Sequence, residues 1–247
     1  MSPVDCIFLD PARRNEHGGK TVAISDCEPN VAKLEGLLLS KANRIMIKLS
    51  PMLDLSQALK ELPHTQEVHI ISVNNECKEL LLLLGQTAPE EIPVHCVNLS
   101  TKGEQEKQLF VFTREQEQHS ECSYTDTLGN YLYEPNASLL KAGAFRSIAA
   151  AYSVKKLHPN SHLYTSDTQI EGFPGRTFRI INRCSLNKKE IKENLSDLKK
   201  ANITVRNFPA TVAELRKRIK LAEGGDTYLF ASTLNDGQKI LIRCGKV

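Results

Sequence analysis

The chain has 247 residues, of which 40% are hydrophobic and 25% charged, and its formal net charge is +3. These values are ordinary for soluble globular proteins, so a disordered chain is not expected. The seven cysteines are odd in number and form no C-x-x-C pair, so neither a disulfide framework nor a metal site is expected. Free thiols of this kind favour a reducing, cytoplasmic setting.

Membrane insertion and secretion are not expected. No apolar stretch approaches the roughly 20 residues that a membrane-spanning helix needs. The first residues also lack the basic and apolar regions of a signal peptide. We therefore expect a cytoplasmic protein with no membrane partner.

From its first residues, the chain alternates short apolar runs with stretches of helical spacing, which is typical of an α/β fold with a parallel sheet. Strands are predicted at 4–9, 44–49 and 68–73. Helices are predicted at 30–40, 53–62 and 76–84. The runs 94–99 and 109–113 are expected to finish the sheet as an antiparallel pair.

The rest of the chain divides into a polar segment and two further units. Residues 115–130 are polar, lack a consistent period and are predicted to be a linker. A helix is expected over 137–152, and a hairpin around Asn235-Asp236-Gly237 near the end. We expect a partial Rossmann-like sheet, the linker, a small domain and a basic α/β domain, over 1–114, 115–130, 131–176 and 177–247.

The first strand bears on whether the sheet is complete. Residues 4–9 are apolar almost throughout, as interior strands of parallel sheets are. The sheet is therefore expected to lack strands that precede this one. Two alternatives remain: an edge strand of a compact fold, or an exposed strand that pairs with a second copy or a partner chain.

A motif with chemical potential follows this strand directly. Asp10-Pro11-Ala12-Arg13-Arg14 lies where open α/β sheets bind ligands, at the carboxyl end of a strand. Asp10 can accept hydrogen bonds from an amine or hydroxyl, and Pro11 offers a carbonyl without a backbone donor. Arg13 and Arg14 suit phosphate or carboxylate. The alternative is an Asp-Pro turn with two solvated arginines.

Asp10-Pro11-Ala12-Arg13 resembles the fourth motif of class I methyltransferases, a strand ending in Asp-Pro-Pro-aromatic or Asp-Pro-Pro-Arg. The whole chain is similar to the C-terminal portion of a bacterial methyltransferase family, common in the Bacteroidetes, that carries a ferredoxin-like and a THUMP-like domain. On this resemblance, 131–176 would be the ferredoxin-like domain and 177–247 the THUMP-like domain. The stretches that carry it are Asp10–Arg14, Lys48–Met52, Val73–Cys77, Tyr133–Ala137 and Gly225–Ala231.

The resemblance implies a set of site residues. Asp10, Pro11 and Arg13 would be catalytic and would face the methyl-accepting atom. The remaining residues of the same cleft would bind substrate: Arg14, Lys48, Ser50 and Asn74. From the residue pattern alone we prefer a plainer interpretation for two of these, in which Ser50 and Asn74 cap the helices that follow.

Two departures from the family pattern limit what the resemblance implies. Ala12 and Arg13 stand where base N-methyltransferases usually carry Pro and an aromatic ring that stacks on an extruded base. The Gly-rich turn and the acidic residue that hold the methyl donor also have no counterpart before Asp10. We therefore expect S-adenosylmethionine as cofactor by resemblance, and a chain that lacks the donor-binding half.

A basic segment lies near the C-terminus. Between Asn182 and Lys220 there are eleven basic residues and four acidic ones. Such an excess attracts phosphate backbones, and the THUMP resemblance implies RNA as the partner. The alternative is a pair of amphipathic helices with solvated basic faces, whose cations also complement a helix dipole. The residues predicted to contact RNA are Lys199, Lys200, Arg216, Lys217 and Arg218.

Two functions are consistent with these features. The first is an RNA-directed, S-adenosylmethionine-dependent methyltransferase, present as a chain that is inactive alone. The second is a non-catalytic RNA-binding or adaptor module that keeps the same scaffold.

Overall fold

The computed structural model describes residues 4–13, 24–101 and 107–247. The chain forms two compact units, residues 1–119 with 136–144 and residues 120–135 with 145–247. Each unit is built on its own main sheet, of six strands in the first and seven in the second. Within the described residues, no helix has both the length and the hydropathy needed to span a bilayer.

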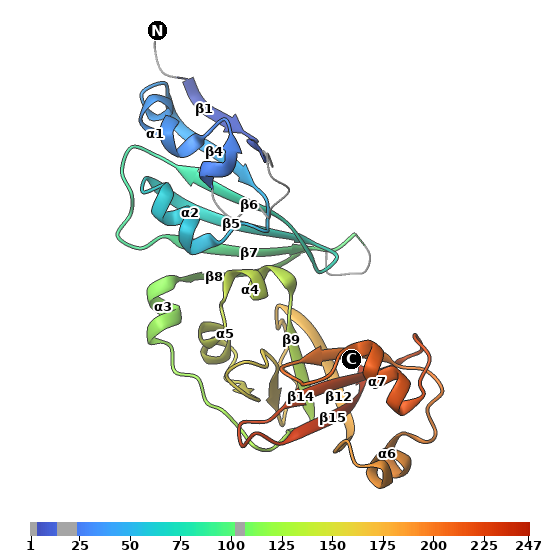
Figure 1. Cartoon of the computed structure of the whole chain (residues 1–247). Helices are drawn as coiled ribbons and strands as arrows, with labels where there is room; N and C mark the ends of the chain where they lie inside the picture. The colour runs from blue at the N-terminus through green and yellow to red at the C-terminus, as the bar shows by residue number, and fades with distance from the viewer. Residues whose placement is uncertain (1–3, 14–23, 102–106) are drawn as a thin grey trace. The chain divides into compact units, whose positions relative to one another are not determined.

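The first unit contains a mixed sheet in the order β1-β4-β6-β5-β7-β8 (Figure 1). Its strands are β1 (Val4–Leu9), β4 (Ala42–Leu49), β5 (Thr65–Val73), β6 (Glu76–Leu84), β7 (Pro93–Leu99) and β8 (Lys107–Thr113). β1, β4, β5 and β7 run in one direction, whereas β6 and β8 run in the other. The carboxyl ends of the first four strands therefore lie at the same edge of the sheet.

Short helices and a small ribbon complete this unit. They are β2 (Ala12–Arg13), β3 (Cys27–Glu28), α1 (Val31–Leu39), α2 (Leu55–Glu61), α3 (Arg114–His119) and α4 (Ala137–Ala142). A 3₁₀ turn over Ile24–Asp26 precedes β3. Asn30 and Asp54 cap α1 and α2 with their side chains, which explains where these helices begin.

The sheet has one buried face and one half-exposed face. Residues paired across five strands form a fully or nearly fully buried row: Ile47, Leu82, Val68, Val94 and Phe112. The next row along the strands points to the opposite face, because successive side chains in a strand alternate. It comprises Lys48, Leu81, His69, His95 and Val111, all partly or largely exposed. This half-exposed face of the sheet therefore carries Lys48 and both histidines.

The helix predicted at 76–84 is wrong, because these residues form β6, antiparallel to both β4 and β5. Asn74 and Asn75 both have positive φ, of 50° and 64°, which makes the two-residue turn of a tight hairpin. Leu80, Leu82 and Leu84 then alternate inward and are fully buried. The run of Glu, Lys and Leu suggests a helix by propensity, but burial in alternation decides for a strand.

β1 lies at the edge of the sheet. Among the described residues it pairs only with β4, in parallel. Val4 and Phe8 are 52% and 58% exposed, although both are large and apolar. β1 is therefore an exposed edge strand. Pairing of its free side with a second copy or a partner chain stays a prediction.

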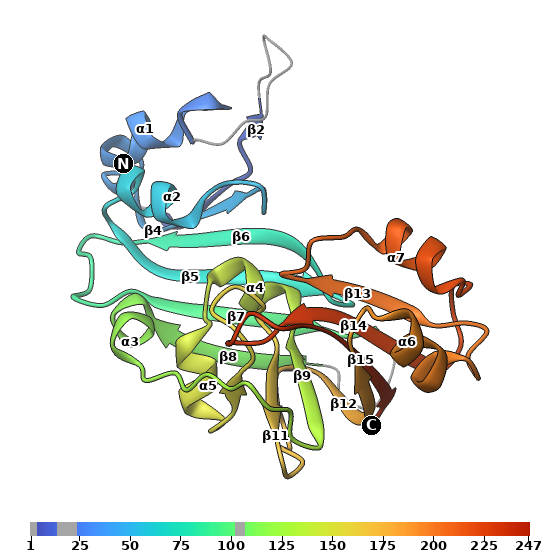
Figure 2. The same ribbon diagram turned by 60° about the horizontal axis from the view of Figure 1, so that its bottom comes forward.

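The second unit is one continuous sheet in the order β10-β11-β9-β12-β15-β14-β13 (Figure 2). Its strands are β9 (Tyr131–Pro135), β10 (Lys155–Lys156), β11 (Tyr164–Ser166), β12 (Gly175–Cys184), β13 (Asn202–Arg206), β14 (Thr227–Thr233) and β15 (Lys239–Lys246). The hairpin predicted at Asn235-Asp236-Gly237 joins β14 to β15, and Gly237 has the positive φ that this turn requires.

Both faces of this second sheet carry a hydrophobic core. One core contains Phe178, Phe230 and Ile242, and the other, under α6 (Lys188–Leu195) and α7 (Val212–Ile219), contains Leu195, Leu215 and other small and branched residues. β12 joins the two halves of the sheet, because it pairs with β9 on one side and with β15 on the other.

The helix predicted over 137–152 is divided into α4 and α5 (Arg146–Ala151). Gly143 ends α4 in the left-handed conformation, with φ 77°, a backbone geometry that glycine adopts without strain. α4 belongs to the first unit and packs on β5, β6 and β7. Residues 115–130, the predicted linker, contain most of α3 and an extended stretch that bridges to Lys156 through Tyr124.

Candidate functional site

The centre of the candidate site is an ion pair between neighbouring strand ends. Asp10 follows β1, and Lys48 lies near the end of β4, the strand that pairs with β1. Lys48 Nζ is 2.6 Å from Asp10 Oδ2, and the two side chains are 31% and 52% exposed. The hydrogen bond to Asp10 is the main reason that the pKa of Lys48 is raised, and the charge of Glu79 raises it further.

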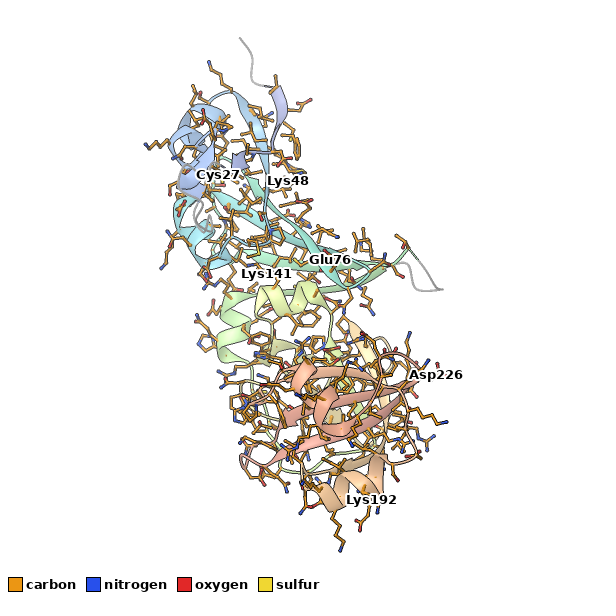
Figure 3. The ribbon with its side chains drawn as sticks, turned by 45° about the vertical axis from the view of Figure 1, so that its right-hand side comes forward. Cys27, Lys48, Glu76, Lys141, Lys192 and Asp226 are labelled. Atoms are coloured by element: carbon orange, nitrogen blue, oxygen red, sulfur yellow. The ribbon has the colours of Figure 1, made fainter. Side chains whose placement is uncertain are left out.

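A cavity of about 260 Å³ adjoins this pair. Its lining comes from the strand ends of β1 and β4, the β2–β3 ribbon and one residue of β6. The lining residues are Asp10, Pro11, Ala12, Cys27, Leu49, Ser50, Pro51 and Lys78. Cys27 and Lys48 are labelled in this part of the chain in Figure 3. Asp10, Pro11 and Ser50, which the sequence singles out separately, therefore lie around one hollow.

The chemistry of this hollow is that of an acceptor with one cation beside it. Asp10 Oδ2 is held by Lys48, and its carboxylate keeps lone pairs with which to accept a hydrogen bond from an amine or hydroxyl. Pro11 is buried and has no backbone N–H, so the wall at that point offers an acceptor and no donor. Such a site can orient a nucleophilic N–H or O–H group.

Ser50 does not cap the helix that follows it. Its hydroxyl accepts from the backbone N–H of Met52 at 3.2 Å, which stabilises a turn, and Asp54 supplies the cap of α2. Asn74 is not a helix cap either. It lies in the β5–β6 turn, where Nδ2 donates to Thr101 Oγ1 at 2.8 Å and Oδ1 accepts from the N–H of Thr101 at 3.0 Å.

Asn74 also lies away from Asp10. β4 and β6 separate β1 from β5 in the sheet, so the two strand ends are three strand spacings apart, about 14 Å. The structure therefore brings together Asp10, Pro11, Lys48 and Ser50 and leaves Asn74 outside this cluster. The expectation that Asn74 reaches the same opening as Asp10 is not met, because β4 and the antiparallel β6 lie between β1 and β5.

Two of the predicted site residues are the arginines that follow Ala12 in the sequence. Arg13 is placed in β2, where it pairs with Cys27 of β3, and Arg14 lies outside the described residues. Three nearby residues were not singled out from the sequence. Cys27 reaches the cavity through the β2–β3 ribbon, and Lys78 and Glu79 belong to β6.

The predicted RNA-contacting residues lie in the second unit and fall into two groups. Lys199, Lys200 and Lys217 are exposed. Arg216 donates to the carbonyl of Ala201 at 3.2 Å, and Arg218, which is also exposed, donates to the carbonyl of Leu186 at 2.8 Å, so both guanidinium groups are hydrogen-bonded to the backbone.

All three basic residues of α7 lie in its last turn, where they complement the helix dipole. Arg216 and Arg218 are also held by hydrogen bonds to carbonyl groups, whereas Lys217 is exposed.

The cavity at Asp10 does not fit S-adenosylmethionine by itself. The cavity at Asp10 is smaller than the 300–1,000 Å³ typical of sites for ligands of this size. Its lining contains a single carboxylate, which Lys48 already engages. No donor-binding residue is therefore assigned within the described part of the chain.

Comparison with known proteins gives two domain matches and one match to a solved structure. The profile of a ferredoxin-like domain matches residues 131–174, and that of a THUMP-like domain matches residues 175–246. A crystal structure described as “putative methyltransferase from Porphyromonas gingivalis W83” is 40% identical with a TM-score of 0.89. The alignment covers 98% of this chain and 60% of that one. No curated protein matches the chain.

These matches confirm the resemblance drawn from the sequence and the fold class, a mixed α/β sheet followed by ferredoxin-like and THUMP-like domains. The chain spans about 60% of the length of the solved structure that it matches.

Proposed function

We propose that this chain, similar along its length to a methyltransferase structure and ending in a ferredoxin-like and a THUMP-like domain, is the acceptor side of an RNA methyltransferase. It would act in the cytoplasm with S-adenosylmethionine as donor. The observation that carries the proposal is the Asp10–Lys48 pair beside a cavity at the carboxyl ends of β1 and β4. This is where an α/β sheet of Rossmann-like design presents its reacting groups.

In this proposal Asp10 accepts a hydrogen bond from the N–H or O–H group that receives the methyl group. Lys48 fixes the carboxylate through its 2.6 Å contact. Ser50 and Pro11 shape the wall of the cavity. Arg13 and Arg14 follow Asp10 in sequence and supply forked donors for a phosphate of the substrate.

The donor is proposed to bind to a segment equivalent to the part of the relative that lies outside the alignment. The free edge of β1 supports this, because an exposed strand with large apolar side chains is a template for pairing. We propose that the donor-holding segment pairs there.

RNA is proposed to bind the second unit, through the exposed lysines Lys199, Lys200 and Lys217. The THUMP-like match over 175–246 and the exposure of these cations support this. Lysines act on phosphate as point charges, so their contribution is independent of sequence and is weakened by salt.

A two-part experiment tests the proposal. S-adenosylmethionine is titrated calorimetrically into this chain and into a version extended to the length of the relative, and the extended version is then given tritiated donor and RNA. We expect only the extended version to bind the donor and to transfer the methyl group, and Asp10→Asn to lower the transfer rate at least about 100-fold. Donor binding should remain unchanged in that variant.

The alternative, a non-catalytic RNA-binding module, is the outcome if the extended version binds RNA but neither binds nor uses the donor. The RNA part is tested separately by Lys217→Ala, with Lys239→Ala, a change of an exposed lysine on β15 of the same unit, as the control. Lys217→Ala should weaken RNA binding equally for different sequences and reduce the salt dependence by about one phosphate contact. Unchanged binding would place the RNA elsewhere.

A further inference from the structure

A cluster of three potential metal ligands lies on the half-exposed face of the first sheet. Glu67 and His69 are two residues apart on β5, and His95 lies directly opposite His69 on the parallel strand β7. One oxygen of Glu67 and one nitrogen of each histidine all lie within 4.8 Å of one another. β5 and β7 run side by side in Figure 1.

The two imidazole rings are stacked with their centroids 4.4 Å apart and their planes 9° from parallel. Glu67 Oε2 lies 3.1 Å from His69 Nε2 and 3.9 Å from His95 Nε2. Nε2 of both rings therefore lies close to the same carboxylate oxygen. The register between β5 and β7 places His95 opposite His69, so all three groups lie together on one face of the sheet.

We propose that Glu67, His69 and His95 bind a divalent transition-metal ion of the zinc class. Two imidazole nitrogens and one carboxylate oxygen are a common ligand set for such an ion, which keeps its remaining position for water or another donor. Zinc bonds of about 2.0–2.1 Å in a tetrahedron place ligand atoms about 3.3 Å apart. The observed separations of 3.1 and 3.9 Å bracket this value.

The strand positions make the site more than a chance contact of flexible groups. All three ligands extend from strands inside a sheet, where β5 pairs with β6 and β7 on its two sides. The side chains of both histidines are 26% exposed and that of Glu67 is 45% exposed, so an ion can enter while its ligands are partly shielded from water.

The proposed site shares a face with the Asp10–Lys48 pair. Lys48, Leu81 and His69 are consecutive members of one row across β4, β6 and β5. Two strand spacings place His69 about 10 Å from Lys48. The metal site is therefore distinct from the cavity at Asp10, and its existence does not depend on the proposed methyl transfer.

The test uses the full chain after removal of metals with a chelator. Zinc(II) is titrated calorimetrically, and cobalt(II) serves as a spectroscopic probe because its visible absorption reports ligand type and geometry. We expect one zinc ion per chain and a four- or five-coordinate cobalt spectrum without sulfur-to-metal charge-transfer bands. His69→Ala and His95→Ala should each lower zinc affinity on the order of 100-fold.

His119→Ala is the matched control, because His119 is a histidine of the same unit on α3, outside the cluster. Glu67→Gln and His95→Gln preserve side-chain size and keep the test decisive if an alanine variant does not fold, as judged by circular dichroism. The proposal is overturned if the parent chain binds no zinc, if the cluster variants bind as tightly as His119→Ala, or if cobalt shows thiolate bands.

Discussion

Removing the charge of Glu134 is expected to destabilise the second unit strongly. Glu134 lies on β9 and is 1% exposed, and its carboxylate accepts from Arg176 of β12 and Arg206 of β13. Arg176 donates to Oε2 of Glu134 through both Nε, at 2.8 Å, and Nη2. Nη2 of Arg206 donates to Oε1 of Glu134 at 2.9 Å. Glu134→Gln leaves two cations facing an uncharged amide.

The expected loss follows from these exposures. Breaking a buried ion pair costs about 3–5 kcal/mol when the remaining charge is trapped without water. Here both arginine side chains are 36% exposed, so water partly rehydrates them once Glu134 is neutral. We therefore expect a loss at the lower end of that range, about 3 kcal/mol.

Hydrogen exchange is the appropriate assay, because it reports on β9 and β12 separately from the first unit. A loss of about 3 kcal/mol corresponds to exchange about 150-fold faster for the most protected amides of these strands. Glu171→Gln, a change of an exposed glutamate in the same unit, should have an effect within about 0.5 kcal/mol. A loss below about 1 kcal/mol for Glu134→Gln would show that the triad is not energetically coupled as described.

Three further outcomes are expected. Asp10→Asn should lower the pKa of Lys48, read by NMR titration of its side chain. Because that pKa is raised in the folded chain, the stabilisation is complete below the ordinary value of 10.5 and is lost as pH rises through the folded value; an unchanged pKa would contradict the ion pair. Asn75→Ala should cost about 2 kcal/mol in urea unfolding, from strain at positive φ and the lost hydrogen bond to the N–H of Ala137, whereas Asn75→Gly should cost about half as much. Cys6, which is exposed, should react with a thiol reagent before the buried Cys244, because burial raises the pKa of Cys244 to about 12. Mass spectrometry measures the two rates, and equal rates would refute this expectation.

Much of the first sheet could be predicted because its strands are strongly apolar. The runs at 4–9, 44–49 and 68–73 are strands, and the pair at 94–99 and 109–113 is antiparallel as expected. Asp10 and Lys48 could be placed together because they end neighbouring strands that run in the same direction. Proximity of this kind requires strands that both run in the same direction and are neighbours, which β1 and β5 are not.

The parts that could not be predicted depend on β6. Its sequence, Glu-Cys-Lys-Glu followed by five leucines, is rich in helix formers and contains no β-branched residue. Only the Asn74-Asn75 turn signals a hairpin, and asparagine is a weaker signal than glycine for positive φ. Because β6 was predicted to be a helix, Lys78 was not expected to line the cavity and Glu79 was not expected near Lys48.

The contacts of Cys27 and the histidine cluster have a different cause. Cys27 reaches the Asp10 cavity through pairing of Ala12 with Glu28, a contact that no local periodicity encodes. His69 and His95 lie opposite each other only because of the register between β5 and β7. A shift of one residue would place the two rings on opposite faces.

The continuity of the second sheet affects how its two family segments can be separated. The match boundary between residues 174 and 175 lies immediately before β12, whose first residues bond to β9 of the ferredoxin-like segment. Cutting the gene at that boundary would expose two unsatisfied backbone ladders and leave each fragment prone to self-association. The two segments share one sheet and one compact unit, so we expect them to fold and unfold together.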